Sequence, residues 1–357
     1  MESPISLPTA LLGTSDTEVS CYLNEVPVFA GQELERLYNT LHSSLPFFRH
    51  FRTMESVSTY VAWRGRQPAV ILLFQVQGRT VHVLNEMIDL EQEEVQRFAS
   101  CVFAKLPRVR IISFKAIRTT VDRFAYPLQK HNAKETFVIT LPATPEQYIA
   151  KLSKNLREQI PYKLRKIERR HPTFSSAFHE KEEIPEQVLR DLIRLSEERI
   201  SQKVSAFAHD EARILALAKE CGFVHILTID GKVCAGTINY YIGSNVFLEV
   251  LGRDPAYSSF SIGLLTMYLS ACESIRRGKR QYFLGGGRFD YKQKLLGILS
   301  EADRVEIYRS HGAMLIHLAN AVATLAHAWV RRAKVWVHAH KTHPVSRLAF
   351  SVFARYR

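Results

Sequence analysis

The order of apolar and polar residues along the chain predicts helices and strands in a repeated arrangement. Apolar residues that recur every three or four positions predict helices at 32–45, 90–104, 144–170, 185–202, 210–220 and 261–276. Runs rich in Val, Ile, Phe and Tyr predict strands at 58–65, 68–76, 79–85, 108–117, 135–142, 224–230, 233–242, 245–254 and 281–286. Two hairpin turns, at Gly78-Arg79 and Asp230-Gly231, separate paired strands. The order of helices, antiparallel strands, one more helix and a final strand occurs twice.

This repetition predicts an α/β (α+β) fold of two tandem domains, each a mixed, mostly antiparallel sheet flanked by helices. The two halves share this order of elements but no visible sequence identity, and we place the boundary near residue 130. The predicted organisation is a flexible tail at 1–20, a first domain at 21–130, a second domain at 131–309 and a separate C-terminal segment at 310–357.

The C-terminal segment combines an apolar background with a polar stripe. Its residues 310–330 carry no charge, which is compatible with a membrane span. Polar residues nevertheless recur at alternating steps of three and four, at His317, Asn320, Thr324, His327, Arg331, Lys334, His338 and Lys341. One polar helix face is unsuited to a spanning helix, so we predict an amphipathic helix. It either packs on the protein's own surface or lies in the headgroup region of an anionic inner membrane.

Composition adds one feature to this picture, the net charge. The chain has 357 residues, 46% hydrophobic and 23% charged, which excludes disordered, collagen-like and disulfide-scaffold proteins. Lys and Arg number 48 against 35 Asp and Glu, and the resulting +13 is typical of proteins with nucleic acid, acidic lipid or an anionic cofactor as partner. After Glu306 the chain has no acidic residue, so its last part carries most of this excess.

Cysteine and histidine spacing indicates no metal and no disulfide. The five cysteines are odd in number and widely separated, and the fourteen histidines are scattered. The start of the chain lacks the basic residues of a secretory signal. We therefore expect a cytoplasmic protein.

Residues 148–170 form a basic helical run that could attract a phosphate or another anion, with Arg157 as a candidate substrate-binding residue. A solvated basic surface explains most of its cations equally well. Nucleic-acid binding is not expected, because only Tyr148 and Tyr162 could stack on bases.

Residues 245–278 combine a strand with a carboxylate, a serine-rich turn and a helix. Glu249 lies in the apolar context FLEVL, so it is either a general base that faces a cleft or an ordinary surface residue. Serines at 258, 259 and 261 are good helix caps, and the free N–H groups of a helix start can bind a pyrophosphate. Gly263 leaves room for a ligand in the first turn.

Residues 281–297 place polar side chains just beyond a strand that ends in three glycines. This glycine run is neither a dinucleotide fingerprint nor a phosphate-binding P-loop, but it permits close backbone approach. The polar residues are Arg288, Asp290, Tyr291, Lys292 and Lys294. Such a cluster at a strand end favours a functional site.

The order of basic helix, strand, Ser261-Ile262-Gly263, helix, strand, glycines and Tyr291-Lys292 resembles the acetyltransferases of bacterial cellulose and exopolysaccharide biosynthesis. They are a branch of the Gcn5-related N-acetyltransferase (GNAT) superfamily and relatives of the Fem peptidyltransferases, which carry two GNAT-like units. The resemblance covers about 135–297 and implies that the first domain is degenerate. The family often has Ser-Pro-Gly where Ser261-Ile262-Gly263 stands, and an Asp where this chain has Leu284.

The resemblance implies an acetyl-coenzyme A donor whose pyrophosphate meets the backbone N–H groups of Phe260, Ser261, Ile262 and Gly263. Glu249 is then the base that takes the proton of the acceptor, and Tyr291 the group that protonates the leaving thiolate or holds the carbonyl oxygen. Asp290 could replace the missing family carboxylate. The cations Lys292, Lys294 and Arg288 would attract the anionic donor or an acidic sugar.

Three functions stay open on this reasoning. The first is transfer of an acyl group to a hydroxyl or amine of a saccharide or other small acceptor. The second is aminoacyl transfer from charged tRNA, as in the Fem relatives. The third is a non-catalytic scaffold at the membrane with a decayed transferase fold.

Overall fold

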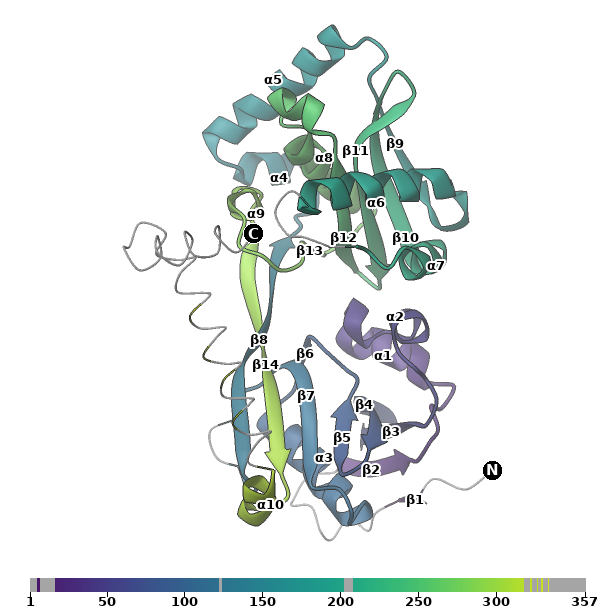
Figure 1. Cartoon of the computed structure of the whole chain (residues 1–357), viewed down its shortest axis with the longest axis vertical. Coiled ribbons are helices and arrows are strands. Elements are labelled where there is room, and N and C mark those ends of the chain that lie inside the picture. The colour runs from purple at the N-terminus through teal and green to yellow at the C-terminus, as the bar shows by residue number, and fades with distance from the viewer. Residues whose placement is uncertain are drawn as a thin grey trace. The chain divides into compact units, whose positions relative to one another are not determined.

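The computed structural model describes residues 5–6, 17–121, 124–201 and 208–317, together with the isolated positions 322, 326, 329 and 333. The chain divides into two compact units (Figure 1). Unit 1 comprises Met1–Val26, Ser56–Lys134 and Glu301–Arg357, and unit 2 comprises Pro27–Glu55 and Glu135–Ser300. The segment 27–55 therefore packs within unit 2, although it precedes most of unit 1 in the sequence.

Unit 1 is a sheet with the strand order β1-β2-β3-β4-β5-β7-β14-β8. Its strands are β1 (Ile5–Ser6), β2 (Thr17–Tyr22), β3 (Val57–Arg64), β4 (Gln67–Gln77), β5 (Thr80–Val83), β6 (Ile88–Asp89), β7 (Ile111–Arg118) and the parts of β8 (Leu128–Thr140) and β14 (Ile298–Tyr308) that belong to it. The helices are α3 (Gln92–Lys105) and α10 (His311–Ile316). Strands β2 to β5 form an antiparallel meander, and β5 pairs with β7 in parallel.

Unit 2 has the strand order β8-β13-β12-β11-β10-β9. Its strands besides β8 are β9 (Ser175–Glu180), β10 (Gly222–Ile229), β11 (Lys232–Ile242), β12 (Asn245–Arg253) and β13 (Gln281–Phe283). Its helices are α1 (Ala30–Tyr38), α2 (Leu45–Phe51), α4 (Pro145–Lys151), α5 (Lys154–Arg170), α6 (Glu186–Ser201), α7 (Glu211–Cys221), α8 (Ile262–Arg276) and α9 (Asp290–Lys294), with short 3₁₀ turns η2 (Leu41–Ser43), η3 (Lys181–Glu183) and η4 (Pro255–Phe260). Only β12 and β13 run parallel among these neighbours.

Helices cover both faces of the unit 2 sheet, because adjacent strand residues point to opposite sides. Val246 packs in the apolar cluster of α4, α5 and α8, whereas its neighbour Phe247 packs in the cluster of α6 and α7. Phe223 and Val224 divide in the same way. The predicted α/β fold with mixed sheets is confirmed.

Most predicted elements are present, and the differences have local causes. The predicted helix at 144–170 breaks at Leu152 and Ser153, where the Ser153 side chain accepts a hydrogen bond from the Leu156 amide, while Pro161 lies inside α5. The helix predicted at 32–45 ends at Tyr38, because Asn39 is left-handed. Among the elements that were not predicted, strand β9 is partly exposed at the sheet edge, and strand β14 carries the charged residues Glu301, Asp303 and Arg304 in its interior.

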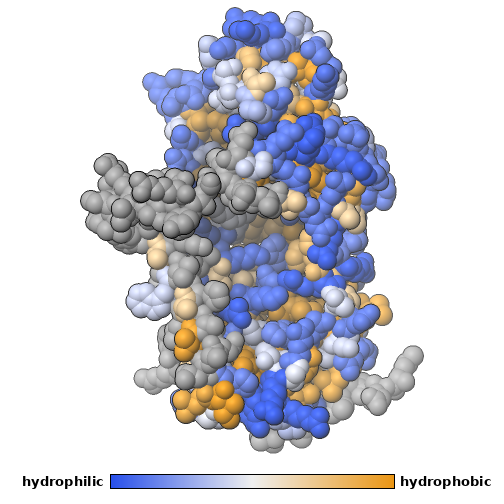
Figure 2. Space-filling view, in the orientation of Figure 1, coloured by the Kyte–Doolittle hydropathy of each residue, from blue (hydrophilic) through white to orange (hydrophobic). Residues whose placement is uncertain are grey.

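Of the C-terminal segment 310–357, the structure describes α10, and the rest of the predicted amphipathic helix lies outside the described residues apart from isolated positions. No helix in the described part of the chain is long and apolar enough to span a membrane. Figure 2 shows mostly hydrophilic residues on the visible face of the described chain.

Candidate active site

A cavity opens where two parallel strands of unit 2 separate. β12 and β13 pair only from Asn245 with Gln281 to Phe247 with Phe283, and β13 then ends. The space beside the continuing part of β12 is a cavity of about 470 Å³, which we call the β12–β13 cavity. It is lined by Ser196, Arg199, Ile200, His209, Leu248, Glu249, Leu251, Arg253, Ser261, Gly263, Leu264, Leu284, Gly285, Gly286, Phe289, Tyr291 and Lys292. Five of the residues predicted for the site are therefore brought together.

A β-bulge directs Glu249 towards this cavity. In the pairing of β11 with β12, Ile238 lies opposite Val250 and Asn239 opposite Leu248, so Glu249 is the extra residue. A bulge can place two consecutive residues on the same side of a strand, and Leu248 and Glu249 both line the cavity. Glu249 is exposed and lines the cavity, whereas Val250 is buried. The geometry therefore favours the interpretation in which Glu249 faces a cleft over the one in which it is an ordinary surface residue.

Helix α8 begins at the cavity without the expected serine cap. Ser261 is left-handed (φ 56°), and its side chain makes no capping hydrogen bond. Its N–H donates to the Ser258 carbonyl at 2.9 Å. Among the described residues, the next two N–H groups, those of Ile262 and Gly263, have no backbone acceptor. Phe260 and Ile262 themselves bury their side chains in an apolar cluster. The predicted set of amide donors thus narrows to Ile262 and Gly263.

The Lys292 side chain stabilises the glycine turn after β13. Its Nζ donates to the Gly285 carbonyl at 2.9 Å and to the Gly286 carbonyl, and the side chain is only 2% exposed. Burial lowers the pKa of Lys292 to about 8. Lys292 therefore lines the cavity, but its ammonium group is directed at the carbonyl oxygens of the turn.

Tyr291 precedes Lys292 in α9 and lines the same cavity. Burial raises the pKa of the Tyr291 phenol, while the charges of Arg199 and Arg253 lower it. At neutral pH the phenol is thus protonated and can donate a hydrogen bond or a proton.

Besides Phe260 and Ile262, four predicted residues lie outside the cavity lining. Asp290 and Lys294 are exposed on α9, and Arg288 forms an ion pair with Glu135 at 3.1 Å. Arg157 is exposed on α5, where its Nη1 lies 3.5 Å from the Ala150 carbonyl oxygen. The fold does not bring these four side chains into the cavity lining.

Sequence reasoning missed two arginines of the lining, Arg199 from α6 and Arg253 from the end of β12. A signal for Arg253 existed, because residues 249, 251 and 253 alternate along one face of a strand. No comparable signal marks Arg199, which stands in an amphipathic helix among other charged residues.

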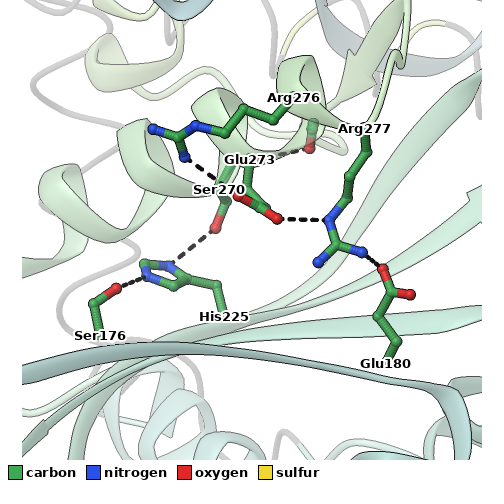
Figure 3. Close-up of polar contacts among 8 residues, drawn as sticks. Ser176, Glu180, His225, Ser270, Glu273, Arg276 and Arg277 are labelled. Carbon is green, nitrogen blue, oxygen red and sulfur yellow. Dashed lines mark hydrogen bonds and ion pairs between the residues drawn. The ribbon is translucent and has the colours of Figure 1, made fainter.

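A buried hydrogen-bond network connects helix α8 to the strands below it (Figure 3). The His225 ring lies 3.0 Å from Ser176 Oγ through Nε2 and 3.2 Å from Ser270 Oγ through Nδ1. The network continues from Ser270 through Thr237 and Asn239 to the Tyr282 hydroxyl, on the strand that ends at the cavity. It fixes α8 relative to β10, β11 and β13, and thereby the start of α8 relative to the glycine turn.

At the edge of this region, Arg277 joins α8 to β9. It forms ion pairs with Glu180 and with Glu273, the latter at 2.8 Å, and Glu273 also meets Arg276 (Figure 3). These partly exposed pairs add little stability.

The cavity therefore combines a carboxylate and a phenol with the start of a helix, where the Gly263 N–H has no backbone acceptor among the described residues. A carboxylate can accept a proton from a nucleophile, and a neutral phenol can give one to a leaving group. Amides at a helix start can hold a phosphate. A proton acceptor, a proton donor and a phosphate-binding helix start are the groups that a transfer reaction with one proton transfer requires.

Comparison with known proteins agrees with this geometry. Residues 154–293 match the family model described as an acetyltransferase (GNAT) domain. Among solved structures, FemX is similar with a TM-score of 0.59 and 8% identity, over 82% of this chain and 98% of FemX. The L-PGS from Bacillus licheniformis has a TM-score of 0.42 and 12% identity, over 70% of this chain and 85% of that protein. No protein of curated function matches the chain.

The FemX likeness confirms the predicted tandem arrangement, and the matched domain confirms the predicted superfamily, while the exopolysaccharide branch stays a prediction. Within this tandem fold, residues 154–293 are similar to a GNAT acetyltransferase domain, whose usual co-substrate is an acyl-coenzyme A.

Proposed function

We propose that the protein uses acetyl-coenzyme A to acetylate a hydroxyl or amine of a saccharide or another small acceptor, in the cytoplasm and in exopolysaccharide or cell-envelope biosynthesis. The observation that supports it most directly is the β12–β13 cavity. There a carboxylate on a bulge, a protonated phenol and a helix start lie within one GNAT domain.

The residues of the cavity divide the work of the reaction. The N–H groups of Ile262 and Gly263 hold the donor's diphosphate, and the opening beside β13 takes its extended arm. The volume of about 470 Å³ suits such a ligand. Glu249 accepts the proton of the acceptor nucleophile, directly or through water, as the new bond forms. Tyr291 donates its proton to the departing thiolate.

Calorimetric titration of the full-length protein with acetyl-coenzyme A tests the proposal. We expect saturable binding, and loss of that binding in Gly263→Leu, because a side chain there covers the helix start. Gly312→Leu is the matched control, since Gly312 is also the second residue of a helix but belongs to α10.

The alternatives give different results in the same experiment. Binding of charged tRNA without acetyl-coenzyme A would favour aminoacyl transfer. Absence of binding to both would favour a scaffold, and either outcome contradicts the proposed function.

A further inference from the structure

The two arginines of the β12–β13 cavity differ from other partly buried arginines of the chain. Most of those have a carboxylate partner: Arg97 with Glu94, Arg277 with Glu273, Arg304 with Glu306. Within the described ranges, neither Arg199 nor Arg253 forms an ion pair. The Nε of Arg199 is also buried without a hydrogen-bond partner among the described residues.

Arg199 and Arg253 lie close enough to act on each other and on the same phenol. Burial lowers the pKa of Arg199, and the charge of Arg253 lowers it further. Both guanidinium groups also lower the pKa of Tyr291. The two like charges therefore share one region of the cavity, although they come from α6 and β12.

The start of α8 adds positive potential to this region. A Cβ atom on Gly263 would come within 2.8 Å of Arg253 Cδ, so the Arg253 side chain lies against the first turn of α8. A helix N-terminus carries a partial positive charge, which repels a guanidinium. Gly263 thus provides space for a cation where electrostatics alone would disfavour one.

The described lining holds little negative charge to balance these groups. Its cations are Arg199, Arg253 and Lys292, and its one carboxylate is Glu249. Lys292 donates to two carbonyl groups, which leaves the arginines as the available donors. A partly desolvated guanidinium pair without an anion is costly, and a bound oxyanion removes that cost through paired N–H···O bonds.

We propose that Arg199 and Arg253 bind a carboxylate or phosphate group of the acceptor, so that the molecule acylated by this protein is an acid. The inference rests on the proposed function, because it assigns the donor's diphosphate to Ile262 and Gly263. Arg199 lines the cavity together with Ser196, Ile200 and His209, a segment separate from α8 and the glycine turn. Glu249 in the same cavity then meets the nucleophile of the anchored acid.

Titration of the full-length protein with inorganic phosphate and, separately, with succinate tests this anion site. Each titration is done with and without saturating coenzyme A. We expect at least one anion to bind in both conditions, and its dissociation constant to rise about tenfold or more in Arg199→Gln and in Arg253→Gln. Arg194→Gln is the control, because Arg194 is an exposed residue of the same helix that pairs with Glu198 at 3.0 Å.

Two results overturn the inference. One is unchanged anion binding in Arg199→Gln. The other is an anion that binds only without coenzyme A, because the arginines then serve the donor. A comparison of phosphate binding with succinate binding shows whether the site prefers a phosphate or a carboxylate group of the acceptor. If Arg199→Gln does not fold, Arg199→Lys keeps the charge without the planar fork, and unchanged anion binding in that variant also contradicts the inference.

The experiment separates this inference from the proposed function. Arginine-dependent anion binding with no binding of coenzyme A supports the anion site and contradicts the acetyl transfer. Binding of coenzyme A together with anion binding that does not depend on the arginines supports the acetyl transfer and contradicts the anion site.

Discussion

Glu249 is the residue whose replacement should affect the reaction most directly. Glu249→Gln keeps the shape of the side chain but cannot accept a proton, and a general base contributes about 100- to 10,000-fold in rate. We therefore expect turnover to fall by at least about 100-fold, with little change in acetyl-coenzyme A affinity. Steady-state kinetics with an acceptor that the wild type acetylates measure the turnover. Glu168→Gln, on the exposed surface of α5, is the control, and wild-type turnover in Glu249→Gln would remove the base role.

His225 makes folding stability depend on pH. Burial lowers the pKa of its imidazole in the folded protein from 6.5 to about 3. Between these values the unfolded chain binds a proton that the folded chain does not, so the free energy of unfolding falls as the pH falls below 6.5. By pH 5 this amounts to roughly 2 kcal/mol.

The test compares urea unfolding at pH 7.5 and pH 5 in the wild type and in His225→Gln. The wild type should lose about 2 kcal/mol more stability than the variant over this interval. His179→Gln on β9 is the control. Equal losses in the wild type and in His225→Gln would show that the buried ring does not resist protonation.

At the scale of elements, the packing of α6 on β12 sets the position of Arg199. A Cβ atom on Gly252 would come within 2.6 Å of the Leu192 carbonyl oxygen and 3.1 Å of its Cα, both backbone atoms of α6. Gly236 on β11 faces the Leu192 side chain in the same way. Glycine on the strands therefore allows the helix its close approach, and Arg199 follows Leu192 by about two helical turns.

Gly252→Ala should thus displace α6 and destabilise the protein by roughly 1–3 kcal/mol, the usual cost of overpacking. Urea unfolding measures the loss, and the anion affinity of the folded variant should fall as well because Arg199 moves. Gly312→Ala, where a Cβ makes only ordinary contacts, should leave stability nearly unchanged. Wild-type stability in Gly252→Ala would contradict this packing role.

The two units differ at corresponding elements, and this difference predicts the number of donor sites. In unit 1, β5 pairs with β7 in parallel, and after β5 ends, β6 pairs with the same strand at Ile117 and Arg118. In unit 2, the place beside β12 after β13 ends is the cavity. We therefore expect one acetyl-coenzyme A per chain. A calorimetric stoichiometry of two would contradict the assignment to unit 2 alone.

At the scale of the whole molecule, the basic C-terminal segment suggests peripheral contact with an anionic membrane. Eight Lys or Arg residues and no Asp or Glu follow Glu306. Such a segment adds about 1 kcal/mol of attraction per cation near an anionic surface. We expect the full chain to sediment with phosphatidylglycerol liposomes, and truncation after residue 317, which keeps α10, to abolish this. Neutral phosphatidylcholine liposomes are the control. Equal binding by the truncated chain and the full chain would show that the membrane contact does not lie in the segment after residue 317.

The sequence by itself determined most of the order of elements, the tandem α/β fold and the segments that carry chemistry. These follow from period and turn residues, which act between neighbours in the chain, and from the motif order around Ser261 and Tyr291. The position of Glu249 within an apolar strand was visible in the same way.

Only the tertiary structure decided which of those residues meet. One bulge in β12 turns Glu249 towards the cavity, and helix packing brings Arg199 beside Arg253 from 54 positions away in the sequence. The same packing directs Lys292 to carbonyl oxygens and leaves Arg157, Arg288, Asp290 and Lys294 outside the lining. The physical reason is that strand register and helix placement depend on contacts between distant segments, which no local pattern records.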